Sequence, residues 1–402
     1  MLFAIILFWF CLVVLCYTYF GYGLILYFFN RIKIGKSKFE SVDWTTLPAI
    51  TLVVPVFNEA LVLEDKISNC IKLDYPTDKL NIIFISDGST DLSVNIINHF
   101  PRIVHLTQAD RAGKMAAINR AMTFVTTPFV LFSDANSFLN PESIKKIVAH
   151  YTNEKVGGVA GEKKVAYSGR HAAMGLGEGF YWKYESVLKQ LDSDFNTVVG
   201  AAGEVFSMRT SLFHPLSEDT ILDDLNLSLK ICLQGYKVVY EPNAFAVEAP
   251  SLNLAEESKR RVRIAAGAFQ SMYRMSYFKH VFKYPLLSFQ FASRRVLRWI
   301  VCPAALLVLY ISNMYIMLYQ PVLGYEAFFF LQSIFYMSAI VGWLFYGSNI
   351  RFYGFFLSFY FVFMNVSIIK GLVKFLTGKQ SILWEKSVRN TLQTQGYIRV
   401  TK

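Results

Sequence analysis

Apolar residues are concentrated at the two ends of the chain, and both ends predict helices that cross a membrane. No charged side chain occurs between residues 1 and 30, and Arg31 opens a basic run directly afterwards. An apolar stretch without charges needs roughly 20 residues to span a bilayer. A signal peptide has a shorter apolar core, which follows positive charge rather than precedes it. Residues 1–30 therefore predict an N-terminal transmembrane helix.

The C-terminal end predicts a second membrane region over residues 299–376, preceded by an amphipathic segment over 281–298 and followed by a basic tail over 377–402. The apolar stretches of this region are residues 299–319, 322–346 and 352–369. The amphipathic segment is typical of a helix that lies along the membrane surface. On that interpretation three of its side chains lie among lipid headgroups: Arg294, Arg295 and Arg298.

The basic residues predict the orientation of the chain. They flank the polar stretch 31–280 on both sides, so the positive-inside rule places this domain in the cytoplasm. The protein is then a multi-pass protein of the plasma (inner) membrane. Four full spans would return both termini to the opposite side, whereas the basic tail prefers the cytoplasm. The number of true spans and the side of the C-terminus therefore stay open.

Composition supports a membrane protein and argues against two other classes. The chain of 402 residues is 54% hydrophobic, which is too apolar for an ordinary soluble protein. Its net charge of +11 is concentrated beside the membrane stretches, which indicates contact with membrane lipids and no nucleic-acid partner. The five cysteines are isolated in sequence, so neither a disulfide framework nor a zinc site is expected.

Between the membrane regions, short apolar runs alternate with segments of helical periodicity. The runs predict strands over residues 49–56, 81–86, 103–106 and 129–133. The other segments predict helices over residues 61–73, 92–99 and 112–125. Such alternation predicts an α/β domain with a mostly parallel sheet covered by helices.

Polar side chains follow three of these strands at their carboxyl ends, where parallel sheets bind ligands. They are Asn58 and Glu59, then Asp87, then Asp134 and Asn136. Each alone fits an ordinary turn or helix start. Carboxylates that gather at one edge repel each other unless a cation or a ligand lies between them, so their coincidence favours a binding site.

Several motifs in this stretch resemble glycosyltransferase family 2, and most closely its membrane-embedded bacterial members related to cellulose, hyaluronan and poly-N-acetylglucosamine synthases. The motifs are VPVFNEA (54–60), ISDGSTD (85–91), RAGKMAAIN (111–119), FSDAN (132–136) and EDTILDDLNLSLKI (218–231). Their order and spacing match from about residue 49 to residue 300. The resemblance implies a nucleotide-binding GT-A fold flanked by transmembrane helices. It also implies an inverting hexosyl- or N-acetylhexosaminyl-transferase, which moves a sugar from a nucleotide diphosphate sugar, usually a UDP-sugar, to a growing polysaccharide or lipid-linked glycan.

The resemblance also implies the donor side of the site. The matching donor-binding residues are Pro55, Asn58, Glu59, Asp87, Lys114 and Asp134. Asp134 and Asn136 would hold Mg²⁺ or Mn²⁺, with an amide in place of a second carboxylate. Because the diphosphate supplies much of the negative charge at the ion, we expect weaker metal binding without nucleotide rather than lost catalysis. The alternative is a catalytically inactive family member that serves as a binding subunit of a polysaccharide synthase complex.

Two acids and two arginines match the catalytic part of the family pattern. Asp224 corresponds to the family's general base, while Asp223 stays open as an alternative base or as a helix-start acid. Arg260 and Arg263 stand where polymer synthases carry Gln-x-x-Arg-Trp and would bind the diphosphate, with Ile264 in place of the tryptophan. On the same segment, Lys259 and Arg261 fit contact with anionic lipid nearly as well.

The acceptor side rests on two stretches that match acceptor-lining positions of the family. They contribute Trp182 from 179–188 and Gly203 and Glu204 from 200–209. Aromatic residues at helical spacing are more often core than sugar platforms, and the glycine also fits a simple turn. The partners implied are a nucleotide sugar donor, a glycan or lipid-linked acceptor and membrane lipids. Four candidate helices are few for a complete pore, which leaves room for an accessory subunit or a homo-oligomer.

Overall fold

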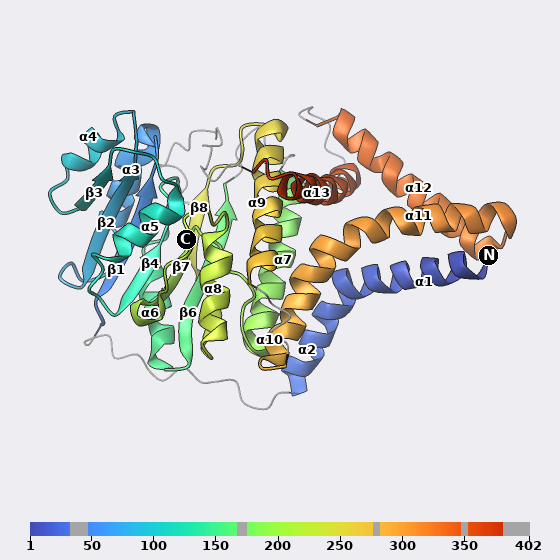
Figure 1. The fold of residues 1–402 in the computed structure, drawn as a ribbon, viewed down its shortest axis with the longest axis horizontal. Coiled ribbons are helices and arrows are strands. Elements are labelled where there is room, and N and C mark those ends of the chain that lie inside the picture. The colour runs from blue at the N-terminus through green and yellow to red at the C-terminus, as the bar shows by residue number, and fades with distance from the viewer. Residues whose placement is uncertain (33–46, 167–174, 276–281, 347–352, 381–402) are drawn as a thin grey trace.

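The computed structural model describes residues 1–32, 47–166, 175–275, 282–346 and 353–380 (Figure 1). Its centre is one 8-stranded sheet with the strand order β3-β2-β1-β4-β7-β6-β8-β5. The strands are β1 (Ile50–Val56), β2 (Leu80–Asp87), β3 (Val104–Gln108), β4 (Phe129–Phe132), β5 (Ser137–Leu139), β6 (Val156–Val165), β7 (Phe206–Arg209) and β8 (Lys237–Glu248).

The sheet is parallel where the sequence predicted it and mixed beyond that part. β1 pairs in parallel with β2 and β4, and β2 pairs in parallel with β3. β7 runs antiparallel to both of its neighbours, β4 and β6, whereas β6 and β8 are parallel and the edge strand β5 runs antiparallel to β8. The four predicted strands and the βαβ alternation are therefore confirmed.

Helices cover both faces of the sheet. They are α3 (Ala60–Ile71), α4 (Ser93–Asn98), α5 (Lys114–Met122), α6 (Ser143–Val148), α7 (Gly175–Phe195), α8 (Asp223–Leu233) and α9 (Leu254–Arg274). Short 3-10 segments follow α6 and β7, at Ala149–Thr152 and Thr210–Leu212. The three predicted helices correspond to α3, α4 and α5, each with ends that differ by a few residues.

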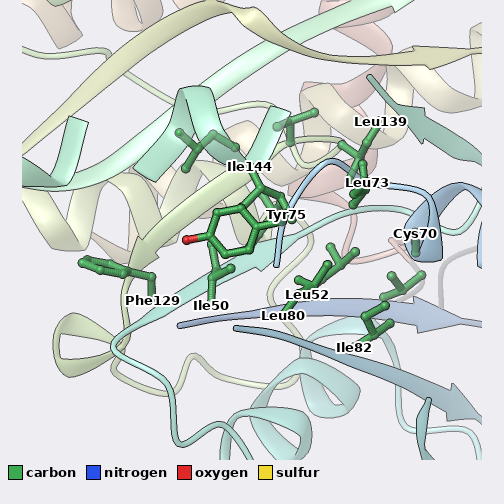
Figure 2. Packing of buried hydrophobic residues seen from close by; sticks show 14 of the residues in the cluster. Ile50, Leu52, Cys70, Leu73, Tyr75, Leu80, Ile82, Phe129, Leu139 and Ile144 are labelled. Carbon is green, nitrogen blue, oxygen red and sulfur yellow. The ribbon is translucent and has the colours of Figure 1, made fainter. Parts of the chain in front are cut away.

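Alternate residues of the central strands supply two separate hydrophobic cores. Leu52 and Ile82 face the layer formed by α3, α4 and α6 (Figure 2). Val53 and Ile83 face the opposite layer, formed mainly by α5 and α8. Because successive side chains of a strand point to opposite faces, a sheet that is covered on both sides reads as a continuous apolar run. This is the pattern that residues 50–56 show.

Within the described residues, four helices are long and apolar enough to cross a membrane, by length and composition: Leu2–Ile32, Pro285–Tyr319, Leu323–Leu344 and Gly354–Leu376. The first consists of α1 (Leu2–Cys16), a π-helical turn (Tyr17–Gly21) and α2 (Tyr22–Ile32). The second consists of α10 (Pro285–Phe291), a π-helical segment (Ala292–Val301) and α11 (Cys302–Tyr319). The others are α12 (Leu323–Leu344) and α13 (Tyr353–Leu376). In Figure 1, α1 and α11 run side by side away from the sheet.

α13 turns back and packs directly against α9 of the sheet domain (Figure 1). Gly371 of α13 lies so close that a Cβ at this position would approach the backbone nitrogen of Ala266 to 2.9 Å. The Phe375 ring stacks on Phe269 one turn further along. Close backbone approach through small residues is typical of tightly packed membrane helices. α9 and α13 therefore form a single packing unit.

The prediction that Arg294, Arg295 and Arg298 lie among lipid headgroups is wrong. Arg294 is 3% exposed, and its guanidinium lies 3.2 Å from Glu185 and 2.9 Å from Asp192, both on α7. Arg298 also pairs with Glu185, and Arg295 donates to a main-chain carbonyl. Burial alone would raise the pKa of Glu185, but the two guanidiniums hold it well below its ordinary value. Arg294 and Arg298 of the π-helical segment thus bind protein carboxylates, and Arg295 binds the protein main chain.

Candidate active site

The loops after β1 and β2 are tied together by the polar residues that the sequence singled out. Asn58 adopts a left-handed conformation with φ 54, and its Oδ1 accepts a hydrogen bond from the Thr90 N–H at 2.8 Å. The Glu59 N–H donates to the Ser93 hydroxyl at 3.0 Å. Pro55 is buried within β1 itself. These hydrogen bonds therefore hold the two loops together at the carboxyl end of the sheet.

Asp87 ends β2 and fixes the start of α5. It is fully buried, and its carboxylate accepts hydrogen bonds from the N–H groups of Ala112 at 2.9 Å and Gly113 at 2.8 Å. Gly113 has φ 103, a conformation that favours glycine, and Lys114 follows it as the first residue of the helix. Asp87 thus determines where the Lys114 side chain enters the site. Its predicted contact with the donor stays a prediction.

The Lys114 ammonium forms ion pairs with two acids of the site. Its Nζ lies 2.9 Å from Asp134 Oδ1 and 3.1 Å from Asp223 Oδ2. A Cβ placed at Gly203 would lie 3.4 Å from this Nζ and 3.6 Å from Asp224 Oδ2. Burial opposes the charged amine, but the carboxylates of Asp134 and Asp223 raise the pKa of Lys114 above its ordinary value. Segments far apart in sequence therefore bring together one cation and three acids beside a glycine.

Asp224 has the electrostatic character of a general base that works near neutral pH. It lies in the first turn of α8, and its Oδ1 accepts a hydrogen bond from the Leu225 N–H at 2.7 Å. Burial and the negative charge of Asp223 raise the pKa of Asp224 to about 7. A base works best when its pKa lies near the operating pH. Asp223 differs because its carboxylate is already paired with Lys114.

Asp134 and Asn136, the predicted ligands of a divalent cation, could hold a cation that takes its other ligands from substrate phosphates. Asn136 Oδ1 is buried and accepts no hydrogen bond from the part of the chain that the structure describes, where a buried acceptor normally has a partner. Asp134 lies two residues earlier and is partly exposed. Among the described residues, no group of three or more His, Cys, Asp or Glu side chains is arranged to hold a metal. Magnesium and manganese sites at nucleotides commonly use one or two protein oxygens together with substrate phosphates.

The basic residues of α9 have different environments. Arg260 donates to Glu257 at 3.1 and 3.2 Å, and Lys259, with a side chain that is 65% exposed, pairs with Glu256. Arg261 is 6% exposed and donates to Glu257 at 2.6 Å and to the Tyr360 hydroxyl of α13 at 2.7 Å. The interpretation of Arg261 as a lipid contact is therefore wrong. Its guanidinium is taken up inside the protein between α9 and α13.

Glu204 and Trp182 lie around a buried lysine that sequence analysis did not identify. Lys163 is 2% exposed and pairs with both Glu204 and Glu248. Burial raises the pKa of Glu204, but Lys163 and, more weakly, Arg260 lower it to about 2. The Lys163 Nζ also lies 5.7 Å from the centre of the Trp182 ring. Lys163 belongs to a charged run within β6, which by sequence alone looks like a solvent-exposed strand.

Arg263, the second arginine expected at the diphosphate, lies on α9 one turn from Arg260. Arg295 was expected at the membrane surface, yet its guanidinium donates to the Val199 carbonyl at 2.7 Å. Val199 precedes the loop that carries Gly203. Arg295 therefore links the start of the C-terminal membrane region to the acceptor side of the site, a role that no sequence signal indicated.

Comparisons with known proteins agree with this architecture. Residues 51–216 match the family model described as Glycosyl transferase family 2. The poly-beta-1,6-N-acetyl-D-glucosamine synthase of Staphylococcus aureus (strain COL) is 26% identical over 265 residues, covering 63% of this chain and 62% of that protein. The protein of the same name from Staphylococcus epidermidis is 26% identical over 272 residues, with the same shares.

The structural comparison concerns the fold. The mannosyltransferase PcManGT from Pyrobaculum calidifontis, solved in complex with GDP-Man and Mn²⁺, superposes with a TM-score of 0.68 at 20% identity. The match covers 93% of this chain and 99% of that chain. The expected GT-A fold with flanking apolar helices is thereby confirmed.

Proposed function

The chain carries a glycosyl transferase family 2 domain, and on this premise we propose that the protein is an inverting membrane glycosyltransferase. It moves a sugar from a nucleotide diphosphate sugar, in our proposal a UDP-sugar, to a growing polysaccharide or lipid-linked glycan. The observation that supports this most strongly is the convergence of Lys114, Asp134, Asp223 and Asp224 beside Gly203 at the carboxyl end of the sheet. The poly-N-acetylglucosamine synthases of the two Staphylococcus species point to the same class of product, although the chain spans only 62% of their length.

In the proposed reaction, Asp224 acts as the general base. Its Oδ2 accepts the proton of the acceptor hydroxyl, which approaches over the open position at Gly203. The acceptor oxygen forms a bond to the anomeric carbon as the bond from that carbon to the diphosphate breaks. The electron pair of the broken bond leaves with the nucleotide diphosphate. Attack from the opposite face inverts the anomeric centre.

The donor side has to stabilise the departing negative charge. Lys114 is the nearest protein cation to the acids of the site, and Arg260 and Arg263 are proposed to bind the diphosphate from α9. Asp134 and Asn136 would hold Mg²⁺ or Mn²⁺, which would offset diphosphate charge when bound. Pro55, Asn58, Glu59 and Asp87 are proposed to shape the nucleoside pocket, and Trp182 and Glu204 the acceptor side. The Mn²⁺ and GDP-Man bound to the mannosyltransferase support a metal and a nucleotide sugar of this kind.

The membrane arrangement belongs to the same proposal. Residues 1–30 and apolar helices within 299–376 would cross the inner membrane, 281–298 would lie at the interface, and 31–280 would face the cytoplasm. Nucleotide sugars are then supplied on the side where the catalytic domain lies.

Turnover of the donor tests the proposal. The detergent-solubilised full chain is incubated with a panel of UDP- and GDP-sugars and Mg²⁺ or Mn²⁺, and released nucleotide diphosphate is measured beside an Asp224→Asn variant. We expect release with one donor, and its loss in the variant. Nucleotide binding without release from any donor, in the presence of glycan acceptors, would favour the inactive binding subunit instead.

A further inference from the structure

Lys66 is a fully buried lysine directly behind the donor side of the site. It is 0% exposed and lies on the face of α3 that packs against the sheet, between Leu63 and Cys70 (Figure 2 shows Cys70 in this core). Lysine is almost never fully buried unless its charge is compensated, because an ammonium loses its hydration there. A lysine at such a position therefore has to be explained by what its ammonium binds.

The Lys66 ammonium holds both ends of the turn that carries the predicted metal ligands. Its Nζ donates to the Ser133 hydroxyl at 2.8 Å and to the Ser137 carbonyl at 2.5 Å. Ser133 directly precedes Asp134, and Ser137 directly follows Asn136. The Ser137 hydroxyl in turn donates to the Asp134 carbonyl at 2.9 Å. One side chain of α3 thus fixes the whole turn between β4 and β5 from behind.

A second side chain of α3 holds the same segment without any charge. Asn69, one helical turn beyond Lys66, donates to the Leu139 carbonyl at 2.8 Å and accepts from the Leu139 N–H at 2.9 Å. An amide would therefore have been sufficient to anchor β5 to α3. Lys66 forms similar anchoring hydrogen bonds, but in its charged form it also carries a positive charge that the anchoring does not require.

The hydrogen-bond acceptors of that charge are neutral. Both are serine oxygens. Burial lowers the pKa of Lys66, while Cys70 and the Asp134 carboxylate favour its charged form. The turn pairs this one carboxylate with the neutral amide of Asn136. Such a turn, backed by a buried cation, is suited to an anionic ligand that brings its own negative charge.

We propose that Lys66 is a positioning residue of the donor site, which fixes the Asp134–Asn136 turn and adds positive potential for the diphosphate of a nucleotide. This inference rests on the proposed function, since it concerns the donor of that reaction. Lys66 does not touch the ligand. It acts through the turn and through its field.

The test compares diphosphate with uncharged ligands. Dissociation constants of UDP, GDP, uridine and guanosine are measured by calorimetry on the detergent-solubilised full chain, with and without Mn²⁺. In Lys66→Met we expect the better-bound diphosphate to lose about 10–100-fold in affinity, the range found when groups supporting a ligand shell are removed. The matching nucleoside should bind as in the wild type. Asn69→Ala loosens the same segment without removing charge and should leave diphosphate affinity within a few fold.

A second variant separates the two parts of the role and guards against misfolding. Lys66→Gln keeps a donor for the serine oxygens and removes only the charge, so its diphosphate affinity should lie between those of the wild type and Lys66→Met. Equal diphosphate affinity in the wild type and the folded Lys66 variants would overturn the proposal, as would an equal loss in Asn69→Ala. A wild-type protein that binds neither diphosphate would instead overturn the proposed function itself, and this inference with it.

Discussion

The ionisation of Asp224 gives the sharpest prediction, because its burial beside Asp223 determines the direction of the pH dependence. Burial and the neighbouring Asp223 charge raise the pKa of Asp224 to about 7. A base with this pKa is about 90% ionised at pH 8 and about 10% at pH 6. The wild-type kcat/KM should therefore fall about tenfold from pH 8 to pH 6. An unperturbed aspartate, with a pKa of about 3.9, would give a flat profile over this range.

Two isosteric variants assign this profile to one carboxylate. Asp223→Asn removes the like charge, so the pKa of Asp224 falls and the acidic limb of the profile moves to lower pH. Asp224→Asn removes the base, so kcat/KM should drop about 10²–10⁴-fold and the limb should disappear. Both variants make the same Asp→Asn change, and they make it at neighbouring positions, so each serves as the control for the other.

The assay is nucleotide diphosphate release over the pH range, with the thermal midpoint recorded at each pH as the folding control. The folded pKa of Asp224 lies above its unfolded value, so ionisation costs stability as the pH rises through about 7. Asp224→Asn should therefore be more stable than the wild type on the alkaline side, while it is less active. The reasoning is refuted if Asp224→Asn keeps the acidic limb and Asp223→Asn loses it, because Asp223 would then be the base.

Three further variants test separate parts of the site. Gly203→Ala places a methyl group 3.6 Å from the Asp224 carboxylate, so acceptor KM should rise at an unchanged thermal midpoint, and Gly179→Ala, at an open position of α7, is the control. Asn136→Asp adds a carboxylate and should tighten Mn²⁺ binding without nucleotide, measured by electron paramagnetic resonance; unchanged affinity would place the ion elsewhere. Glu185→Gln leaves two buried arginines without their shared carboxylate and should cost about 3–5 kcal/mol, seen as a lower thermal midpoint, and an unchanged midpoint would contradict this account.

The first half of the sheet was predictable because its strands carry their own signal. Residues 50–56 are apolar except for Thr51 and are buried throughout, as expected for a strand covered on both faces, and polar residues mark its end. The second half was not, because β7 (Phe206–Arg209) lies outside the βαβ alternation and runs antiparallel between β4 and β6. The place of such a strand in the sheet is defined by partners far away in sequence, which a local pattern does not contain.

Some residues of the site could also be predicted from the sequence, and others could not. Lys114, Asp134 and Asp224 were expected together, because each belongs to a motif and parallel strands end at one edge. Lys66 follows Glu64 and Asp65, so by sequence it belongs to a solvent-exposed charged turn of α3, and only the packing places it inside. The basic segment before α11 looked lipid-facing for a similar reason, since the acids that bind it lie on α7, about a hundred residues earlier.

In the proposed membrane arrangement, the close contact between α13 and α9 makes the reaction rate depend on the thickness of the lipid bilayer. A transmembrane helix adjusts its tilt to the surrounding hydrocarbon depth. Gly371 packs against Ala266, and the Tyr360 hydroxyl accepts a hydrogen bond from Arg261. A change in the tilt of α13 would therefore also move α9 and its arginines. Lipids of different chain length would then change the reaction rate with no change in any residue of the site. In that arrangement the sheet domain is mechanically coupled, through α9, to the apolar helix α13.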